Sequence, residues 1–163
     1  MTLFLLGYEG ADSTDVPSNT VKYCQSTSVR AGLATKYRVW SNASGNAKIA
    51  LYDDSSDQPN NRLSAQQVIS CSASQWNDGN LVTPVSIADA TKYWLGINSD
   101  TFGVCCRNTG TQNVYNISDA TYSTWTFPDP ANLDSATLQT TNIYKLALYG
   151  SGGARLFSMG VGF

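Results

Sequence analysis

Histidine is absent from the 163 residues of this chain, and charged side chains make up only 13% of them. Without histidine, the chain lacks the commonest general base and cannot build a Ser-His-Asp or Cys-His mechanism. It also lacks a common zinc ligand, and its four cysteines never form the CxxC spacing of structural zinc sites. We therefore expect no catalytic residues, no bound metal and no cofactor.

Basic clusters and long apolar runs are missing as well. The chain has 10 Lys and Arg residues, no run of them and a formal net charge of -2. Nucleic acids and anionic membranes are bound largely through basic clusters, so we expect neither as a partner. No apolar segment approaches the roughly 18 residues of a membrane helix. The start, MTLFLLGYEG, does not read as a signal peptide. We favour export by another route, such as a virus particle released by lysis, over a secretion signal that has been removed.

The four cysteines are Cys24, Cys71, Cys105 and Cys106. Full pairing would allow three connectivities, between which sequence cannot choose. We favour buried free thiols over a disulfide. Neighbouring residues on a strand point to opposite faces, so at most one of Cys105 and Cys106 should face the core.

Alternation of apolar and polar residues is the main structural signal, and it is clearest from Ala31 to Asp54. Two alternating runs flank the polar segment Ser41 to Asn46, a pattern that predicts a β-hairpin within an antiparallel sheet. The residues expected on its buried face are Leu33, Tyr37, Val39, Ala47, Ile49 and Leu51.

The same period of two recurs along the chain. Thr91 to Ser99 should bury Tyr93, Leu95 and Ile97, and Asn142 to Tyr149 should bury Tyr144, Leu146 and Leu148. Phe102 to Arg107 and Gln112 to Ser118 are expected to form a second hairpin. We predict an all-β fold, an antiparallel sandwich of about nine or ten short strands over residues 1–150, without an amphipathic helix.

The last residues, 151–163, form a glycine-rich tail with large apolar side chains. A glycine-rich end would fray unless it packs against something. It could pack on its own sandwich or on a neighbouring subunit, and we favour docking on a neighbouring subunit in a homo-oligomer or on a lattice of other subunits. The partner-binding residues would be Leu156, Phe157, Met159, Val161 and Phe163.

Aromatic residues are the best candidates for ligand binding. Sugar rings have apolar C–H faces, and aromatic side chains flanked by polar groups can stack on them. The candidates are Trp76, Tyr115, Tyr122 and Trp125, with Trp40 and Trp94 on the polar faces of their strands. The long segment Asp119 to Asp134 holds two of the candidates, and long loops are often functional. The competing interpretation, which we weight more heavily, places these rings at the edge of the core or in a subunit interface.

Acidic residues offer two weaker candidates. The cluster Asp53-Asp54-Ser55-Ser56-Asp57 could supply oxygen ligands to calcium, but it lacks the EF-hand spacing, so a turn is the favoured interpretation. Paired carboxylates could hydrolyse glycosides. The available acids lie mostly in expected loops, where solvation explains them; among them are Asp53, Asp54, Asp57, Asp119, Asp129 and Asp134.

A longer pattern resembles known modules. The series ATKYRVWSNASGNAKIALYDDSSDQPNNRLS, then a Trp before VTPVSI, then ATKYWLGINSD, spans roughly Leu33 to Asp100. It resembles the jelly-roll sandwiches of carbohydrate-binding modules and of surface proteins of tailed bacteriophages. The resemblance implies a non-enzymatic module of jelly-roll type. It also implies that the following are packing residues: Pro84, Val85, Ile87, Tyr93 and Leu95.

Our leading hypothesis is therefore a virion surface protein, a capsid decoration or a head or tail fibre component, with host cell-surface glycans as a candidate ligand. The alternative is a soluble carbohydrate-binding module of a secreted glycan-active protein. A carboxylate-dependent hydrolase is the third possibility.

Overall fold

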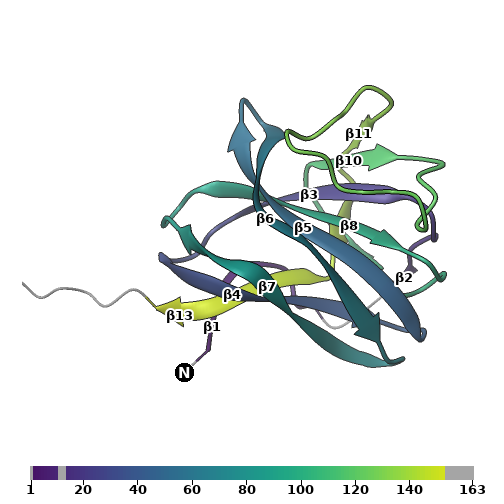
Figure 1. Ribbon diagram of the computed structural model, residues 1–163, viewed down its shortest axis with the longest axis horizontal. Helices are drawn as coiled ribbons and strands as arrows, with labels where there is room; N and C mark the ends of the chain where they lie inside the picture. The colour runs from purple at the N-terminus through teal and green to yellow at the C-terminus, as the bar shows by residue number, and fades with distance from the viewer. Residues whose placement is uncertain (1, 11–13, 153–163) are drawn as a thin grey trace, which may run out of the picture.

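The computed structural model describes residues 2–10 and 14–152, which form thirteen strands and no helix (Figure 1). All the strand pairs are antiparallel, and the all-β sandwich predicted from the sequence is confirmed. The strands outnumber the nine or ten expected, because Thr14–Asp15 and Thr137–Gln139 form short strands where none was expected and the strand expected over Asn142 to Tyr149 is divided in two. Within the described ranges, no helix is long and apolar enough to cross a membrane.

One layer is a four-stranded sheet in the order β1-β13-β4-β7. Its strands are β1 (Leu3–Gly7), β13 (Leu146–Gly152), β4 (Gly32–Ser41) and β7 (Gln75–Ile87). Because β13 ends at Gly152, it crosses the boundary expected at residue 150. The apolar tail residues expected to bind a partner lie outside the described residues: Leu156, Phe157, Met159, Val161 and Phe163.

The other layer is a six-stranded sheet in the order β11-β10-β3-β8-β5-β6. Its strands are β11 (Thr137–Gln139), β10 (Val114–Ile117), β3 (Val21–Thr27), β8 (Lys92–Ser99), β5 (Gly45–Ser55) and β6 (Gln58–Cys71). A short third sheet has the order β12-β9-β2 and consists of β12 (Asn142–Tyr144), β9 (Cys106–Thr109) and β2 (Thr14–Asp15).

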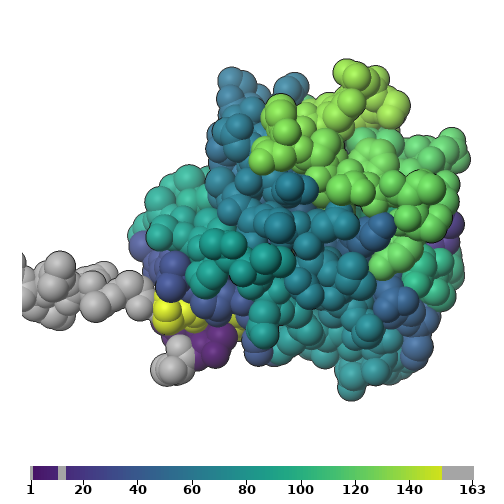
Figure 2. Space-filling model, viewed as in Figure 1, coloured from purple at the N-terminus to yellow at the C-terminus, as the bar shows by residue number. Residues whose placement is uncertain are grey.

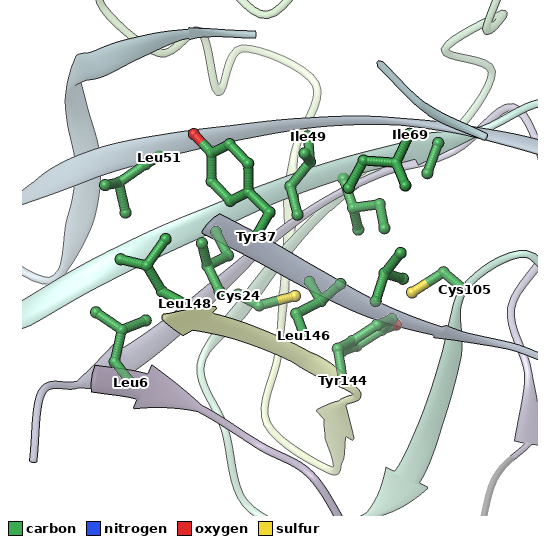
Figure 3. Close-up of a cluster of buried hydrophobic side chains, with 14 of the residues drawn as sticks. Leu6, Cys24, Tyr37, Ile49, Leu51, Ile69, Cys105, Tyr144, Leu146 and Leu148 are labelled. Atoms are coloured by element: carbon green, nitrogen blue, oxygen red, sulfur yellow. The ribbon is translucent and has the colours of Figure 1, made fainter. Parts of the chain in front are cut away.

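The main core lies between the four-stranded and six-stranded sheets (Figure 3). Side chains from β4, β5 and β13 point toward one another there, as the alternation predicts. Each Leu or Ile buried in this way contributes about 1.5–3 kcal/mol. The predicted core residues that have at most 6% of their surface exposed are Tyr37, Val39, Ala47, Ile49, Leu51, Tyr93, Leu95, Ile97, Tyr144, Leu146 and Leu148.

Leu33 is the exception, because 41% of its surface is exposed. The pairing of β4 with β13 shifts between Tyr149 and Gly150, which pair with Lys36 and Ala34, so β4 has one extra residue there that interrupts its alternation. Ala34 and Tyr37 therefore both face the core, although they are an odd number of residues apart. The burial predicted for Leu33 was wrong.

The predicted hairpin from Ala31 to Asp54 was also wrong. β4 pairs with β13 and β7, whereas β5 pairs with β6 and β8, so the two strands belong to different layers. The connection crosses from one sheet to the other, and both Asn42 N and Ala43 N donate hydrogen bonds to Gly103 O. Two strands facing each other across a core show the same alternation as two neighbours in one sheet.

The hairpin predicted for Phe102 to Arg107 and Gln112 to Ser118 was also wrong, because its two strands join different sheets. β9 belongs to the three-stranded sheet, and β10 belongs to the six-stranded sheet. The strand expected over Asn142 to Tyr149 is likewise divided at Lys145 into β12 and β13, which join different sheets.

A second core covers the opposite face of the six-stranded sheet. Its buried rings are Tyr23, Tyr52, Trp94 and Phe127. The segment 118–136, green in Figures 1 and 2, lies over this face and inserts Phe127. A Cβ atom added to Gly96 would lie 2.6 Å from the Phe127 ring, so glycine lets the ring approach the strand. Both faces of β8 are therefore buried.

All four cysteines are buried free thiols, as favoured from the sequence. Cys24, Cys71 and Cys105 belong to the main core, whereas Cys106 does not. Burial raises the pKa of the Cys106 thiol to about 11 and raises the pKa values of the other three. Thiolates are the reactive form, so these cysteines act as small packing residues.

Candidate functional site

The structure does not bring the four candidate aromatic residues together. Trp76 lies on β7 of the four-stranded sheet, and Tyr115 lies on β10 of the six-stranded sheet. Tyr122 and Trp125 lie in the segment that covers the second core, and they alone of the four meet around a common residue, Lys48. All four rings are half-buried.

Lys48 ties Tyr122 and Trp125 to β5. Its ammonium group donates hydrogen bonds to Tyr122 O at 2.6 Å and Trp125 O at 2.8 Å, and it lies 4.6 Å from the centre of the Tyr122 ring. Trp125 packs edge to face on Phe127, with the ring centres 6.4 Å apart. Tyr115 packs on Trp94 with the two rings tilted by 42° and their centres 5.5 Å apart. These three candidates thus help to hold the second core.

Trp76 has a different setting. It lies directly opposite Trp40 in the pairing of β7 with β4, and the two indole rings meet edge to face with centres 5.7 Å apart. The ammonium of Lys145 lies 4.3 Å from the centre of the Trp40 ring and 5.6 Å from that of Trp76. Trp40 Nε1 donates a 2.8 Å hydrogen bond to Asn42 Oδ1. The two tryptophans therefore form a fixed pair.

A second aromatic pair lies farther along the same sheet. Phe4 on β1 and Tyr149 on β13 are register partners whose ring centres are 5.7 Å apart. The guanidinium of Arg38 lies 4.8 Å from the centre of the Tyr149 ring. The Tyr149 hydroxyl donates a hydrogen bond to Glu9 Oε2. Because Tyr149 pairs with Lys36, four residues from Trp40, the aromatic pairs are about 13 Å apart along the strands.

Charged groups lie between the two aromatic pairs. Arg38 donates two hydrogen bonds to Asp78, at 2.7 and 3.2 Å, and Lys36 donates one at 3.1 Å. The side chains of Arg38 and Asp78 are 31% and 32% exposed, so solvent reaches both. The bonds from Arg38 lower the pKa of Asp78, which holds the carboxylate in its charged form.

We call this surface the aromatic face, and it consists of Phe4, Lys36, Arg38, Trp40, Trp76, Asp78 and Tyr149. Alternation places Lys36, Arg38 and Trp40 outward because Tyr37 and Val39 face the core. Sequence reasoning named Trp76 and Trp40 but missed the others. The outward parity of Arg38 was visible in the sequence, whereas its contacts with Asp78 and Tyr149 were not.

Two hollows lie on opposite faces of β12. Ile143 lines a hollow of about 390 Å³ together with neutral polar residues that include Gln25, Gln112 and Asn113. Asn142 and Tyr144 line the second hollow, which has a volume of about 540 Å³ and also contains Lys22 and Arg107. None of these residues was a candidate from the sequence.

The acidic cluster Asp53 to Asp57 is explained by its hydrogen bonds. Asp53 accepts two from Asn61, and Asp54 accepts one from Trp94 Nε1 at 2.6 Å and one from Gln25 Nε2 at 2.8 Å. Ser56 and Asp57 have φ angles of 54° and 60°, as in a tight turn. The favoured interpretation as a turn is confirmed. Across residues 2–10 and 14–152, no three acidic or cysteine side chains form a metal-binding group.

In comparisons with known proteins, no family model and no curated protein matches this chain.

Proposed function

We propose that this protein is a non-enzymatic binding module that recognises glycans through the aromatic face, and that it acts on the surface of a virus particle as a decoration or fibre component. The observation that carries the proposal is the arrangement of two aromatic pairs with Arg38 and Asp78 between them.

The chemistry of this face suits a sugar chain. Aromatic rings can cover the apolar C–H faces of sugar rings, and charged or amide groups can bond to the hydroxyls between them. Arg38 and Asp78 fix each other, and Arg38 also holds Tyr149. Side chains that are held in place before binding lose less conformational entropy when a ligand arrives.

The candidate aromatic residues on the side of the six-stranded sheet are less suited to this role. Tyr115 and Trp125 pack against the second core, and the Lys48 ammonium lies over the ring of Tyr122. Truncating them should weaken the attachment of segment 118–136. The two sheets can therefore be compared directly by mutation.

Trp76→Ala is expected to weaken glycan binding by a factor of about 30, because a central aromatic contact typically contributes about 2 kcal/mol to binding. Glycan-array screening of the wild-type protein would first identify a ligand. Titration calorimetry with that ligand would then give the dissociation constants of the wild type and the variant.

Trp125→Ala is the matched control, since it makes the same change in the segment that covers the other sheet. If Trp125→Ala lost binding and Trp76→Ala kept it, the site would lie on the side of the six-stranded sheet instead. Silence of the wild-type protein across the array would contradict glycan recognition altogether. Thermal melts of both variants would check that each remains folded.

The placement on a virus particle is supported by the resemblance over Leu33 to Asp100 and by the apolar composition of residues 153–163. We expect light scattering to give an oligomer for the full chain and a monomer for a chain that ends at Gly152. A monomer in both cases, with no affinity for capsids, would contradict this placement. A monomer that still binds glycans would support the alternative, a secreted carbohydrate-binding module.

A further inference from the structure

The second hollow contains two cationic side chains from different strands. Lys22 is the second residue of β3, and Arg107 is the second residue of β9. Lys22 shares the strand face of Cys24, which belongs to the main core, so its side chain points into the space between the sheets. Lys22 therefore reaches the hollow from the interior of the sandwich, whereas Leu138, Thr140 and Thr141 line it from exposed positions.

Lys22 is almost completely buried, with 6% of its surface exposed. Its ammonium donates a hydrogen bond to Asn116 Oδ1, and Asn116 is its partner on β10. A neutral amide oxygen satisfies one of the three ammonium donors and does not balance the charge. Burying a cation without a counter-ion is costly, and such groups are normally paired.

Arg107 increases this imbalance. Its guanidinium donates a hydrogen bond to another neutral group, Asn142 Oδ1. Over residues 2–10 and 14–152, no carboxylate lies within 4.0 Å of the charged nitrogens of either residue. Burial is the main effect on Lys22 and lowers its pKa. Cys24 and Cys105 raise this pKa, whereas the charge of Arg107 lowers it further. The two cations thus lie close enough to repel each other.

The rest of the lining carries no charge. The neutral residues Thr140, Thr141, Gln139 and Tyr144 line the same hollow. Pro17 and Leu138 complete it, and no Asp or Glu is among its lining residues. Two cationic side chains with no acidic residue in the same lining form an environment that is complementary to an anion.

We propose that this hollow binds an oxyanion between Lys22 and Arg107, either a free inorganic sulfate or phosphate or the carboxylate of an acidic sugar. The site shares no residue with the aromatic face and does not depend on it. An oxyanion there would balance the two cations and accept charge-assisted hydrogen bonds from both.

Titration calorimetry tests the site with four probes: sodium sulfate, inorganic phosphate, glucuronate and, as a neutral control, glucose. Sodium chloride would hold the ionic strength constant, so that general screening does not differ between the titrations. We expect saturable binding of at least one anion at a single site and none of glucose. Preference for glucuronate would identify an acidic sugar, and preference for sulfate or phosphate would identify a free inorganic anion.

Two variants locate the binding. Lys22→Met keeps most of the apolar stem and removes the charge, and Arg107→Gln removes the guanidinium from a half-buried position. Each should raise the dissociation constant about tenfold or more, because each removes a charge-assisted hydrogen bond. Arg30→Gln removes the same charge from an exposed position and should leave the dissociation constant unchanged.

Several results would overturn the proposal. They are the absence of saturable binding in the wild type, wild-type affinity in either folded variant, or an equal loss of affinity in Arg30→Gln. Far-UV circular dichroism would check the fold of each variant. If Lys22→Met does not fold, Arg107→Gln alone decides the outcome.

Discussion

Ile49→Asp is expected to unfold the protein. Ile49 is completely buried in the main core, on β5 between the two large sheets (Figure 3). The change removes about 1.5–3 kcal/mol of apolar burial. It also buries an unpaired carboxylate, which costs several kcal/mol more. The sum approaches the roughly 5–15 kcal/mol by which a domain is normally stable. Loss of the cooperative urea transition, followed by circular dichroism, would show the effect.

Val68→Asp provides the control, because it also replaces a β-branched residue with aspartate on a strand of the same sheet. Val68 is 47% exposed, so the variant should lose about 1 kcal/mol or less. A native, cooperatively melting Ile49→Asp protein would contradict a core between the sheets at this position.

Phe127→Ala should lower the free energy of unfolding by about 3–5 kcal/mol, the usual cost of deleting a buried phenylalanine ring. The ring is completely buried and packs against Tyr23, Tyr52 and the backbone of Gly96. Without it, segment 118–136 loses its main apolar contact with the six-stranded sheet. Urea denaturation would measure the stability, and hydrogen exchange would report the opening of the segment.

Phe102→Ala is the matched control for this prediction. Phe102 is 58% exposed, so the same truncation should change the stability by about 0.5 kcal/mol or less. Equal losses in the two variants would show that segment 118–136 contributes no core of its own. A large loss in Phe127→Ala alone would establish that the sandwich has two apolar layers.

The segment Asp119 to Asp134 shows how the structure changed an interpretation. Its length and its aromatic content indicated a functional loop. In the structure, Phe127 faces the sheet, Tyr52 donates a hydrogen bond to Pro128 O, and Arg62 N donates one to Asp129 Oδ1. Nothing local to the segment distinguishes an aromatic residue that covers a sheet from one that awaits a ligand. The difference lies in Tyr23, Tyr52 and Trp94, which come from other strands.

The candidate sites were only partly visible in the sequence. Trp76 and Trp40 were candidates because of their residue type and parity, but their pairing required β4 and β7 to be neighbours. The contacts of Arg38 with Asp78 and Tyr149 join three strands that are distant in the chain. Lys22 on β3 and Arg107 on β9 are far apart in the sequence, and only the fold places them in one hollow.

The sequence by itself determined that the fold is all-β and, for most of the strands, which face is buried. Tyr93, Leu95 and Ile97 were identified correctly because the side-chain direction follows the local period of two. The tertiary structure decided which strands pair, as the separation of β4 from β5 and of β9 from β10 shows. It also decided that Leu33 is exposed and that the outer face of β8 is covered. Alternation is a property of neighbouring residues, whereas pairing and coverage depend on the apolar surfaces that distant segments bury against one another.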